Sequence, residues 1–122
     1  MDFYRSQEVP HWLPFDGHVQ VVVDFFPGQI AFNLSGEKFD EQRVVASCPS
    51  SELGPLSDEE LANLLPVHAK VYCRIEMPVQ EVNLMVSAFV EHFTRDPSRF
   101  CLTLVLASRE PHLDEILKLN LH

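Results

Sequence analysis

KVYCRIEMP at Lys70–Pro78 and VNLMVSAFVEHFTRDPSRFCLTLVLAS at Val82–Ser108 are the stretches that say most about the fold. In the first, apolar and polar side chains alternate over Lys70–Glu76, as in a strand with one buried face. The second contains two apolar segments separated by a polar turn, Arg95–Arg99. Its later segment, Phe100–Ala107, is typical of a buried strand. These residues predict antiparallel strands joined by short turns.

The stretch Pro78–Thr94 fits two structures. As a strand, it places four apolar side chains on one face: Leu84, Val86, Ala88 and Val90. As a helix, it forms an apolar stripe from Val79 to Phe93 at spacings of three and four residues, and this periodicity fits slightly better. The β-branched and aromatic content favours a strand. We predict a strand from about Asn83 onward and keep the helix as the alternative.

The first half of the chain predicts three more strands. Apolar side chains alternate over His18–Ser35, which indicates a β-hairpin. A polar link is expected at Gly36–Glu41, and a third strand at Gln42–Cys48.

Two helices are also expected. Ser57–Glu60 reads SDEE, the pattern of a capping box, in which the Ser57 hydroxyl and the Glu60 carboxylate each accept a hydrogen bond from the other residue's backbone N–H. Pro66 would end this short helix. A second helix is predicted in the tail from Pro111, with one apolar stripe.

Size and charge narrow the class of protein. The 122 residues suit one domain, and the formal net charge is −9. Such acidity argues against binding to nucleic acid, where a basic surface supplies most of the attraction. No apolar run approaches the roughly 20 residues of a membrane helix. The N-terminus lacks the pattern of a signal peptide, and the three cysteines form no disulfide framework. We therefore expect a cytoplasmic protein without membrane insertion.

Motifs for catalysis or metal binding are absent from the sequence. The six histidines and three cysteines show none of the usual ligand spacings. There is no nucleophile elbow and no glycine-rich phosphate loop. We expect neither an enzyme nor a metal site.

The strand order over Lys70–Lys118, with the turn AFVEHFTRDPSRF and the closing helix, resembles a PilZ domain, a small barrel best known as a bacterial receptor for cyclic diguanylate. The resemblance implies a mainly β fold: a six-stranded antiparallel barrel with a short internal helix and a C-terminal helix. If Pro78–Thr94 were helical, the fold would instead be an α/β or α+β sandwich. We expect an aromatic and proline-rich arm at residues 1–17 and a single PilZ-like domain at residues 18–122.

The nucleotide-binding motifs of the family are degenerate here. PilZ receptors use an R-x-x-x-R segment before the barrel and a [D/N]-x-S-x-x-G segment at an early strand. Arg5 offers the first arginine, but Val9 stands where the second belongs. Asn33 and Ser35 match the second motif, whereas Lys38 replaces its glycine. Another register, at Cys48–Leu53, keeps only the serine and has Arg43 nearby.

The resemblance therefore implies a non-enzymatic bacterial signalling or adaptor domain that acts through a protein partner, with weak or no binding of cyclic diguanylate and no other cofactor. One alternative is a genuine receptor that uses Arg5, Asn33 and Ser35, with Arg43 or Arg74 in place of the missing arginine. Another is an acidic inhibitor or immunity-type protein with a helix at Pro78–Thr94 that binds a basic partner.

Overall fold

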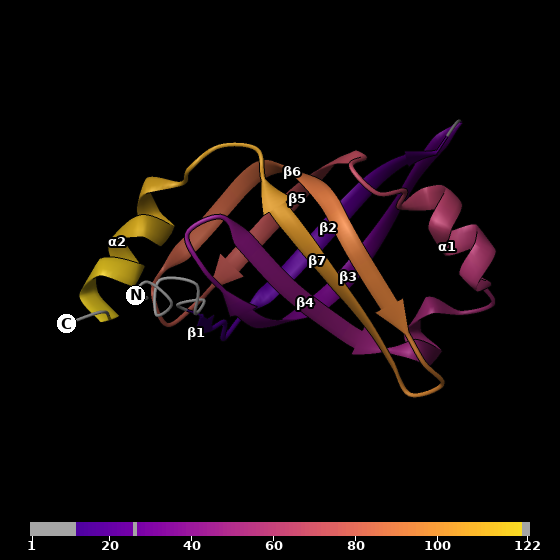
Figure 1. Ribbon diagram of the computed structural model, residues 1–122, viewed down its shortest axis with the longest axis horizontal. Coiled ribbons are helices and arrows are strands. Elements are labelled where there is room, and N and C mark those ends of the chain that lie inside the picture. The colour runs from indigo at the N-terminus through magenta and orange to yellow at the C-terminus, as the bar shows by residue number, and fades with distance from the viewer. Residues whose placement is uncertain (1–11, 26, 121–122) are drawn as a thin grey trace, which may run out of the picture.

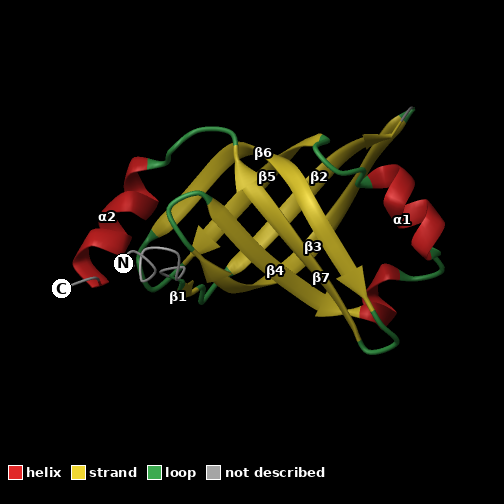
Figure 2. Cartoon of the chain, viewed as in Figure 1, coloured by secondary structure: helices red, strands yellow, loops and turns green. Residues whose placement is uncertain are grey.

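The protein is described by a computed structural model that covers residues 12–25 and 27–120. It is a closed barrel of six antiparallel strands with one additional short strand and two α-helices (Figure 1, Figure 2). The strands are β1 (Leu13–Pro14), β2 (His18–Phe25), β3 (Gly28–Phe39), β4 (Arg43–Pro49), β5 (Lys70–Met77), β6 (Val82–Arg95) and β7 (Arg99–Leu106). The helices are the 3₁₀ helix η2 (Ser50–Leu53), α1 (Asp58–Leu64) and α2 (Pro111–Asn120).

Each barrel strand pairs with two neighbours. The order is β3-β2-β5-β6-β7-β4, and β4 pairs with β3 to close the ring. The helices α1 and α2 lie at opposite ends of the barrel (Figure 1). The six-stranded barrel, its internal helix and its C-terminal helix are confirmed.

The ambiguous stretch is the strand β6, so the helical alternative for Pro78–Thr94 is wrong. Its backbone pairs with β5 on one side and β7 on the other, with Val90 opposite Leu104. The pairing with β7 shifts between Val90 and His92. This bulge changes the phase of the alternation and lets Phe93 pack on Phe100, with ring centroids 5.5 Å apart. The inhibitor hypothesis loses the helix on which it depended.

The expected hairpin is formed by β2 and β3, and the expected third strand is β4. The expected polar link is largely wrong, because β3 continues to Phe39. Its pairing with β4 shifts between Gly36 and Lys38. That bulge returns Phe39 to the interior, where its residue is 1% exposed. A strict alternation of buried and exposed side chains along β3 does not predict that the strand changes its buried face at this bulge.

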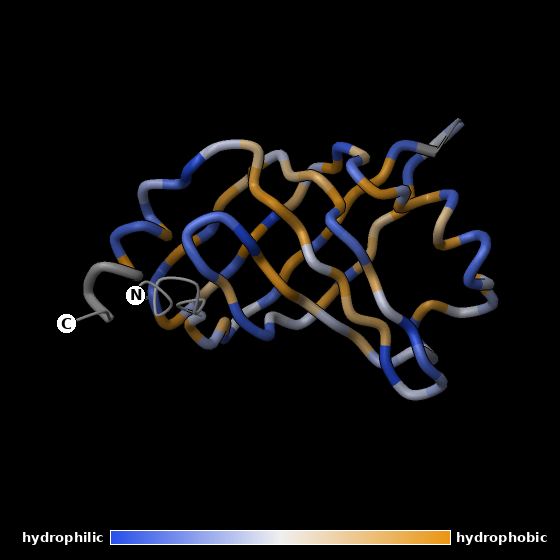
Figure 3. The backbone as a smooth tube through the Cα atoms, viewed as in Figure 1, coloured by the Kyte–Doolittle hydropathy of each residue, from blue (hydrophilic) through white to orange (hydrophobic). Residues whose placement is uncertain are grey.

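The core fills the inside of the barrel. Phe100 of β7 is fully buried, and its ring lies 6.4 Å from that of Phe32 of β3, with β4 between these two strands in the barrel. Apolar residues dominate the middle of the strands, and the turn between β6 and β7 is polar (Figure 3). The remaining large, almost inaccessible side chains include Phe39, Leu61, Leu65, Ile75, Met77, Leu102, Leu104 and Leu113.

The helix α1 begins as its sequence predicts. The backbone N–H of Glu60 donates to Ser57 Oγ at 3.1 Å, and the N–H of Ser57 donates to Glu60 Oε1 at 2.8 Å. Leu61 is buried on the barrel side. Among the described residues, no helix is both long and apolar enough to cross a membrane.

The described part of the predicted arm packs on the barrel. Leu13 and Pro14 pair with the end of β3, and Phe15 is 3% exposed against Phe39. Arg5 and the rest of residues 1–11 lie outside the described residues. The division of the chain after residue 17 stays a prediction.

Candidate functional site

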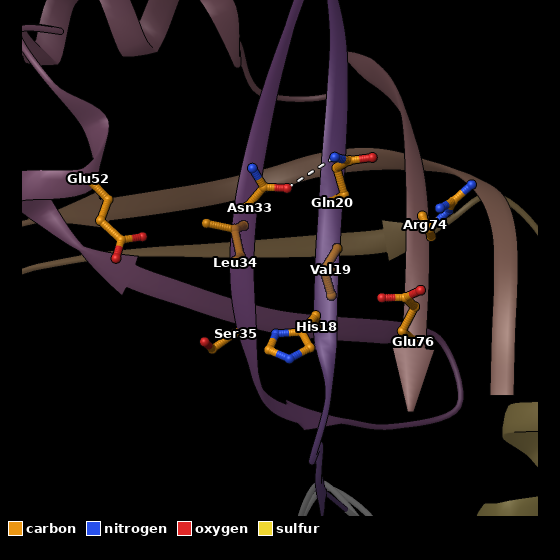
Figure 4. Close-up of a pocket in the computed structure, with 9 residues that line it drawn as sticks. All are labelled: His18, Val19, Gln20, Asn33, Leu34, Ser35, Glu52, Arg74 and Glu76. Carbon is orange, nitrogen blue, oxygen red and sulfur yellow. Dashed lines mark hydrogen bonds between the residues drawn. The ribbon is translucent and has the colours of Figure 1, made fainter. Parts of the chain in front are cut away.

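A pocket of about 400 Å³ lies on the outer wall of the barrel over β2, β3 and β5 (Figure 4). Its polar side chains come from all three strands, and Glu52 of η2 closes one side. The polar strand residues are His18, Gln20, Asn33, Ser35, Arg74 and Glu76, and Val19 and Leu34 also line the pocket.

Strand register brings these residues together in two rows. Gln20 of β2 lies opposite both Asn33 of β3 and Arg74 of β5, and these three residues form one row. The second row, two residues along, is formed in the same way by Ser35, His18 and Glu76. Outward side chains repeat every second residue, so both rows face solvent.

The structure unites part of the expected nucleotide site. Asn33 and Ser35 line the pocket, and so does Arg74, one of the two substitutes considered for the missing arginine. Arg43 does not: its Nε lies 3.1 Å from the Glu91 carboxylate, in a separate groove. Arg5 lies outside the described residues.

The other possible register of the motif places its serine elsewhere. The Ser50 hydroxyl is buried and donates to the Asp96 carbonyl at 2.5 Å. This hydroxyl therefore stabilises the turn between β6 and β7 and is not directed toward a ligand. Glu52, from the same segment, reaches the pocket as a carboxylate.

The charges in the pocket oppose an anionic ligand. The pocket lining includes one arginine, Arg74, and two carboxylates, Glu52 and Glu76, and Arg74 forms an ion pair with neither of them. The amide of Asn33 is already engaged, because its Oδ1 accepts a hydrogen bond from Gln20 Nε2 at 3.0 Å. The described pocket offers a doubly anionic nucleotide no net electrostatic attraction.

The rest of the motif segment, Gly36–Lys38, does not line this pocket. A Cβ added at Gly36 would lie 2.4 Å from Phe15 Cγ and 2.7 Å from the Phe15 carbonyl oxygen. The Gly36 N–H also donates to the Gly17 carbonyl at 2.8 Å. Gly36 thus permits a close backbone approach of the segment around Phe15, not of a ligand.

Glu37 and Lys38 line a second groove of about 690 Å³ over β4 and β7. Glu37 accepts hydrogen bonds from the buried Ser47 hydroxyl and from Arg99. The Ser47 hydrogen bond, helped by Arg99, lowers the pKa of the Glu37 carboxyl. The Lys38 ammonium lies 4.7 Å from the centre of the Trp12 ring. The lysine that replaces the family's glycine therefore has a packing role.

The cysteines and other ligand-type residues form no reactive centre in the described ranges. Burial raises the pKa of Cys73 to about 12, which keeps its thiol protonated at neutral pH. Between Trp12 and Asn120, Phe26 excepted, the structure contains no group of three or more His, Cys, Asp or Glu side chains placed to hold a metal ion.

Sequence reasoning missed His18, Gln20 and Glu76 as members of the site. The alternation of apolar and polar residues in the sequence indicated only that these three side chains point outward from their strands. The pairing between β2 and β3 places His18 beside Ser35 and Gln20 beside Asn33. Glu76 joins this surface through the pairing between β2 and β5, and these two strands are not neighbours in the sequence.

No family model matches the sequence, and no curated protein matches it. Solved structures do match its fold. The inhibitor of motility MotI/DgrA from Bacillus subtilis has a TM-score of 0.60 at 12% identity, over 93% of this chain and 50% of that chain. The PlzA protein of Borreliella burgdorferi, solved in complex with c-di-GMP, has a TM-score of 0.52 at 10% identity, over 88% and 46%.

Both are PilZ-domain proteins, so the chain has a PilZ-like barrel, as its sequence resemblance predicted. The chain spans about half the length of each of these proteins. At such low sequence identity, the structural similarity establishes the fold alone.

Proposed function

We propose that the chain is a PilZ-type signalling domain that acts by binding a protein partner, with weak or no binding of cyclic diguanylate. Its fold is that of a motility inhibitor and of a protein solved with c-di-GMP. By analogy with such adaptor and receptor domains, the proposed role is non-catalytic and cytoplasmic.

The charge of the pocket carries this proposal. Recognition of guanine and phosphate relies on paired guanidinium groups that stack and form bidentate hydrogen bonds. The described pocket has one arginine and two carboxylates. Glu37 and Lys38, at the end of the family motif, are engaged with Arg99 and Trp12.

Isothermal titration calorimetry of the whole chain with cyclic diguanylate tests the proposal. We expect no saturable heat at micromolar protein. Binding with a Kd in the low micromolar range or tighter would overturn it.

One observation favours a second candidate, a genuine receptor for cyclic diguanylate. Arg74 lies in the same row as Asn33, so a substitute arginine is in place beside the retained part of the motif. Arg5 would supply the second guanidinium. This candidate requires that Arg5→Ala and Arg74→Ala each abolish binding, and unchanged affinity in either variant would reject it.

A further inference from the structure

Exposed apolar side chains gather on the outer wall formed by β5 and β6. Tyr72 is 51% exposed, Met85 68% and Phe89 38%. They are three of the five large apolar residues that are strongly exposed in the described part of the chain. A cluster of this kind on one wall is typical of an interaction surface, whereas isolated exposed apolar residues are ordinary.

The register makes this cluster continuous. Tyr72 lies opposite Ser87, so Met85 and Phe89 occupy the two diagonal positions beside its ring. Diagonal neighbours on an antiparallel pair are within reach of aromatic side chains. The small Ser87 leaves space between them. On its other side, Tyr72 lies opposite the half-buried Val22 of β2.

Two cations flank the apolar cluster. Lys70 and Arg74 stand two residues before and after Tyr72 on the same face of β5. The Lys70 ammonium lies 5.9 Å from the centre of the Tyr72 ring. Cross-strand pairing places Arg74 beside Met85 and Lys70 beside Phe89.

These cations lack acidic partners within the described residues. The other arginines with described side chains each pair with a carboxylate: Arg43 with Glu91, Arg95 with Asp58, Arg99 with Glu37, and Arg109 with Asp114. Arg74 forms no such pair, although Glu76 lies two residues further along the strand. The chain has a net charge of −9 and so contains many carboxylates. Among those in the described part of the chain, none forms an ion pair with Lys70 or Arg74.

We propose that this wall docks a protein segment in which an apolar side chain is flanked by carboxylates, an inference that rests on the protein-binding function proposed above. The apolar side chain lies over Ser87 against the Tyr72 ring. The carboxylates reach Arg74 on one side and Lys70 on the other, about 13 Å apart along the strand. Arginine and tyrosine beside apolar neighbours are the residue types that contribute most to protein interfaces.

The test is site-specific photocrosslinking of the whole chain in its host cell. A photoreactive phenylalanine analogue replaces Ser87 in one variant and Asn63, which lines a separate groove beside α1, in another. We expect the Ser87 position to crosslink a different protein through a segment with Asp or Glu on both sides of an apolar residue. A synthetic peptide with that sequence should bind the purified chain.

Charge-reversal variants distinguish specific docking at this wall from non-specific electrostatic binding. Arg74→Glu should weaken binding of the peptide at least tenfold. Arg109→Glu, an equal change in net charge at the base of α2, should leave the affinity within about twofold. Equal losses in both variants would contradict local recognition.

The proposed docking would be overturned if the Ser87 position crosslinked to something other than such a segment. The alternatives are a second copy of this chain, its own residues 1–11, or a partner segment without carboxylates. Crosslinking at Asn63 alone would reject this wall while leaving the protein-binding function intact. Absence of crosslinks at both positions would count against this docking wall and against the protein-binding function. The calorimetric titration with cyclic diguanylate tests the proposed function independently.

Discussion

The segment Asn33–Lys38 divides into two halves with different physical roles. Asn33 and Ser35 face solvent in the pocket over β2 and β5. Gly36, Glu37 and Lys38, which span the bulge in β3, are engaged with Phe15, Arg99 and Trp12. The contrast shows that Lys38, which replaces the glycine of the family motif, has its own contact within the protein, with the Trp12 ring.

The largest effect is expected at Gly36. Gly36→Ala places a Cβ within 3 Å of Phe15, including its backbone oxygen, so the segment around Phe15, just after β1, must move. We expect a loss of about 2–3 kcal/mol in the free energy of unfolding, measured by urea denaturation. A cost near that of an ordinary surface substitution would show that the packing of this half is not tight.

A smaller effect, dependent on pH, is expected at Glu37. Its folded pKa lies below the ordinary 4.5, so its ionised form stabilises the fold above that pH and the contribution is lost as the pH falls through the folded pKa. Glu37→Gln should cost about 1 kcal/mol at pH 7, since the site is partly exposed.

Unfolding of this variant and the wild type is compared across pH 7 to pH 3. The difference should shrink on acidification below about pH 4.5. A difference that is independent of pH would contradict the ion pair with Arg99.

At Lys38, we expect a loss of about 0.5 kcal/mol on substitution by alanine. The substitution removes the ammonium from the Trp12 ring, and Trp12 is the single tryptophan of the chain. Its fluorescence should therefore change in the folded state. Lys38→Arg keeps the positive charge over the ring and serves as the control, so equal spectral changes in both variants would argue against the contact.

The smallest effects are expected in the exposed half. Asn33→Ala and Ser35→Ala should each alter the free energy of unfolding by less than about 0.5 kcal/mol in either direction. The same urea measurements used for Gly36→Ala provide the values. A large loss at Ser35 would erase the distinction between the two halves.

Much of the architecture could be predicted from the sequence, because its signals are local. The alternation over Lys70–Glu76, the capping box at Ser57–Glu60 and the turn Arg95–Arg99 each specify an element from neighbouring residues. The two bulges could not be predicted. Each changes the face of a strand at one residue, and the change is visible only in the pairing with the neighbouring strand.

The site could be predicted only in part, for the same reason. The motif identified Asn33 and Ser35, and the β2–β3 hairpin adds Gln20. Arg74 joins the row only through the pairing between β2 and β5, which are separated by two other strands in the sequence. The exposed wall around Tyr72 also follows from register, since its residues look like ordinary outward positions when each strand is considered alone.

The most direct measurement is a two-dimensional ¹H–¹⁵N NMR titration of the whole chain with excess cyclic diguanylate. If the exposed half of the motif no longer binds the nucleotide, the amide signals of Asn33, Ser35 and Arg74 should stay in place throughout. Saturable shifts at these three residues, with a Kd in the low micromolar range, would show that the pocket is a nucleotide site and would contradict the proposed function.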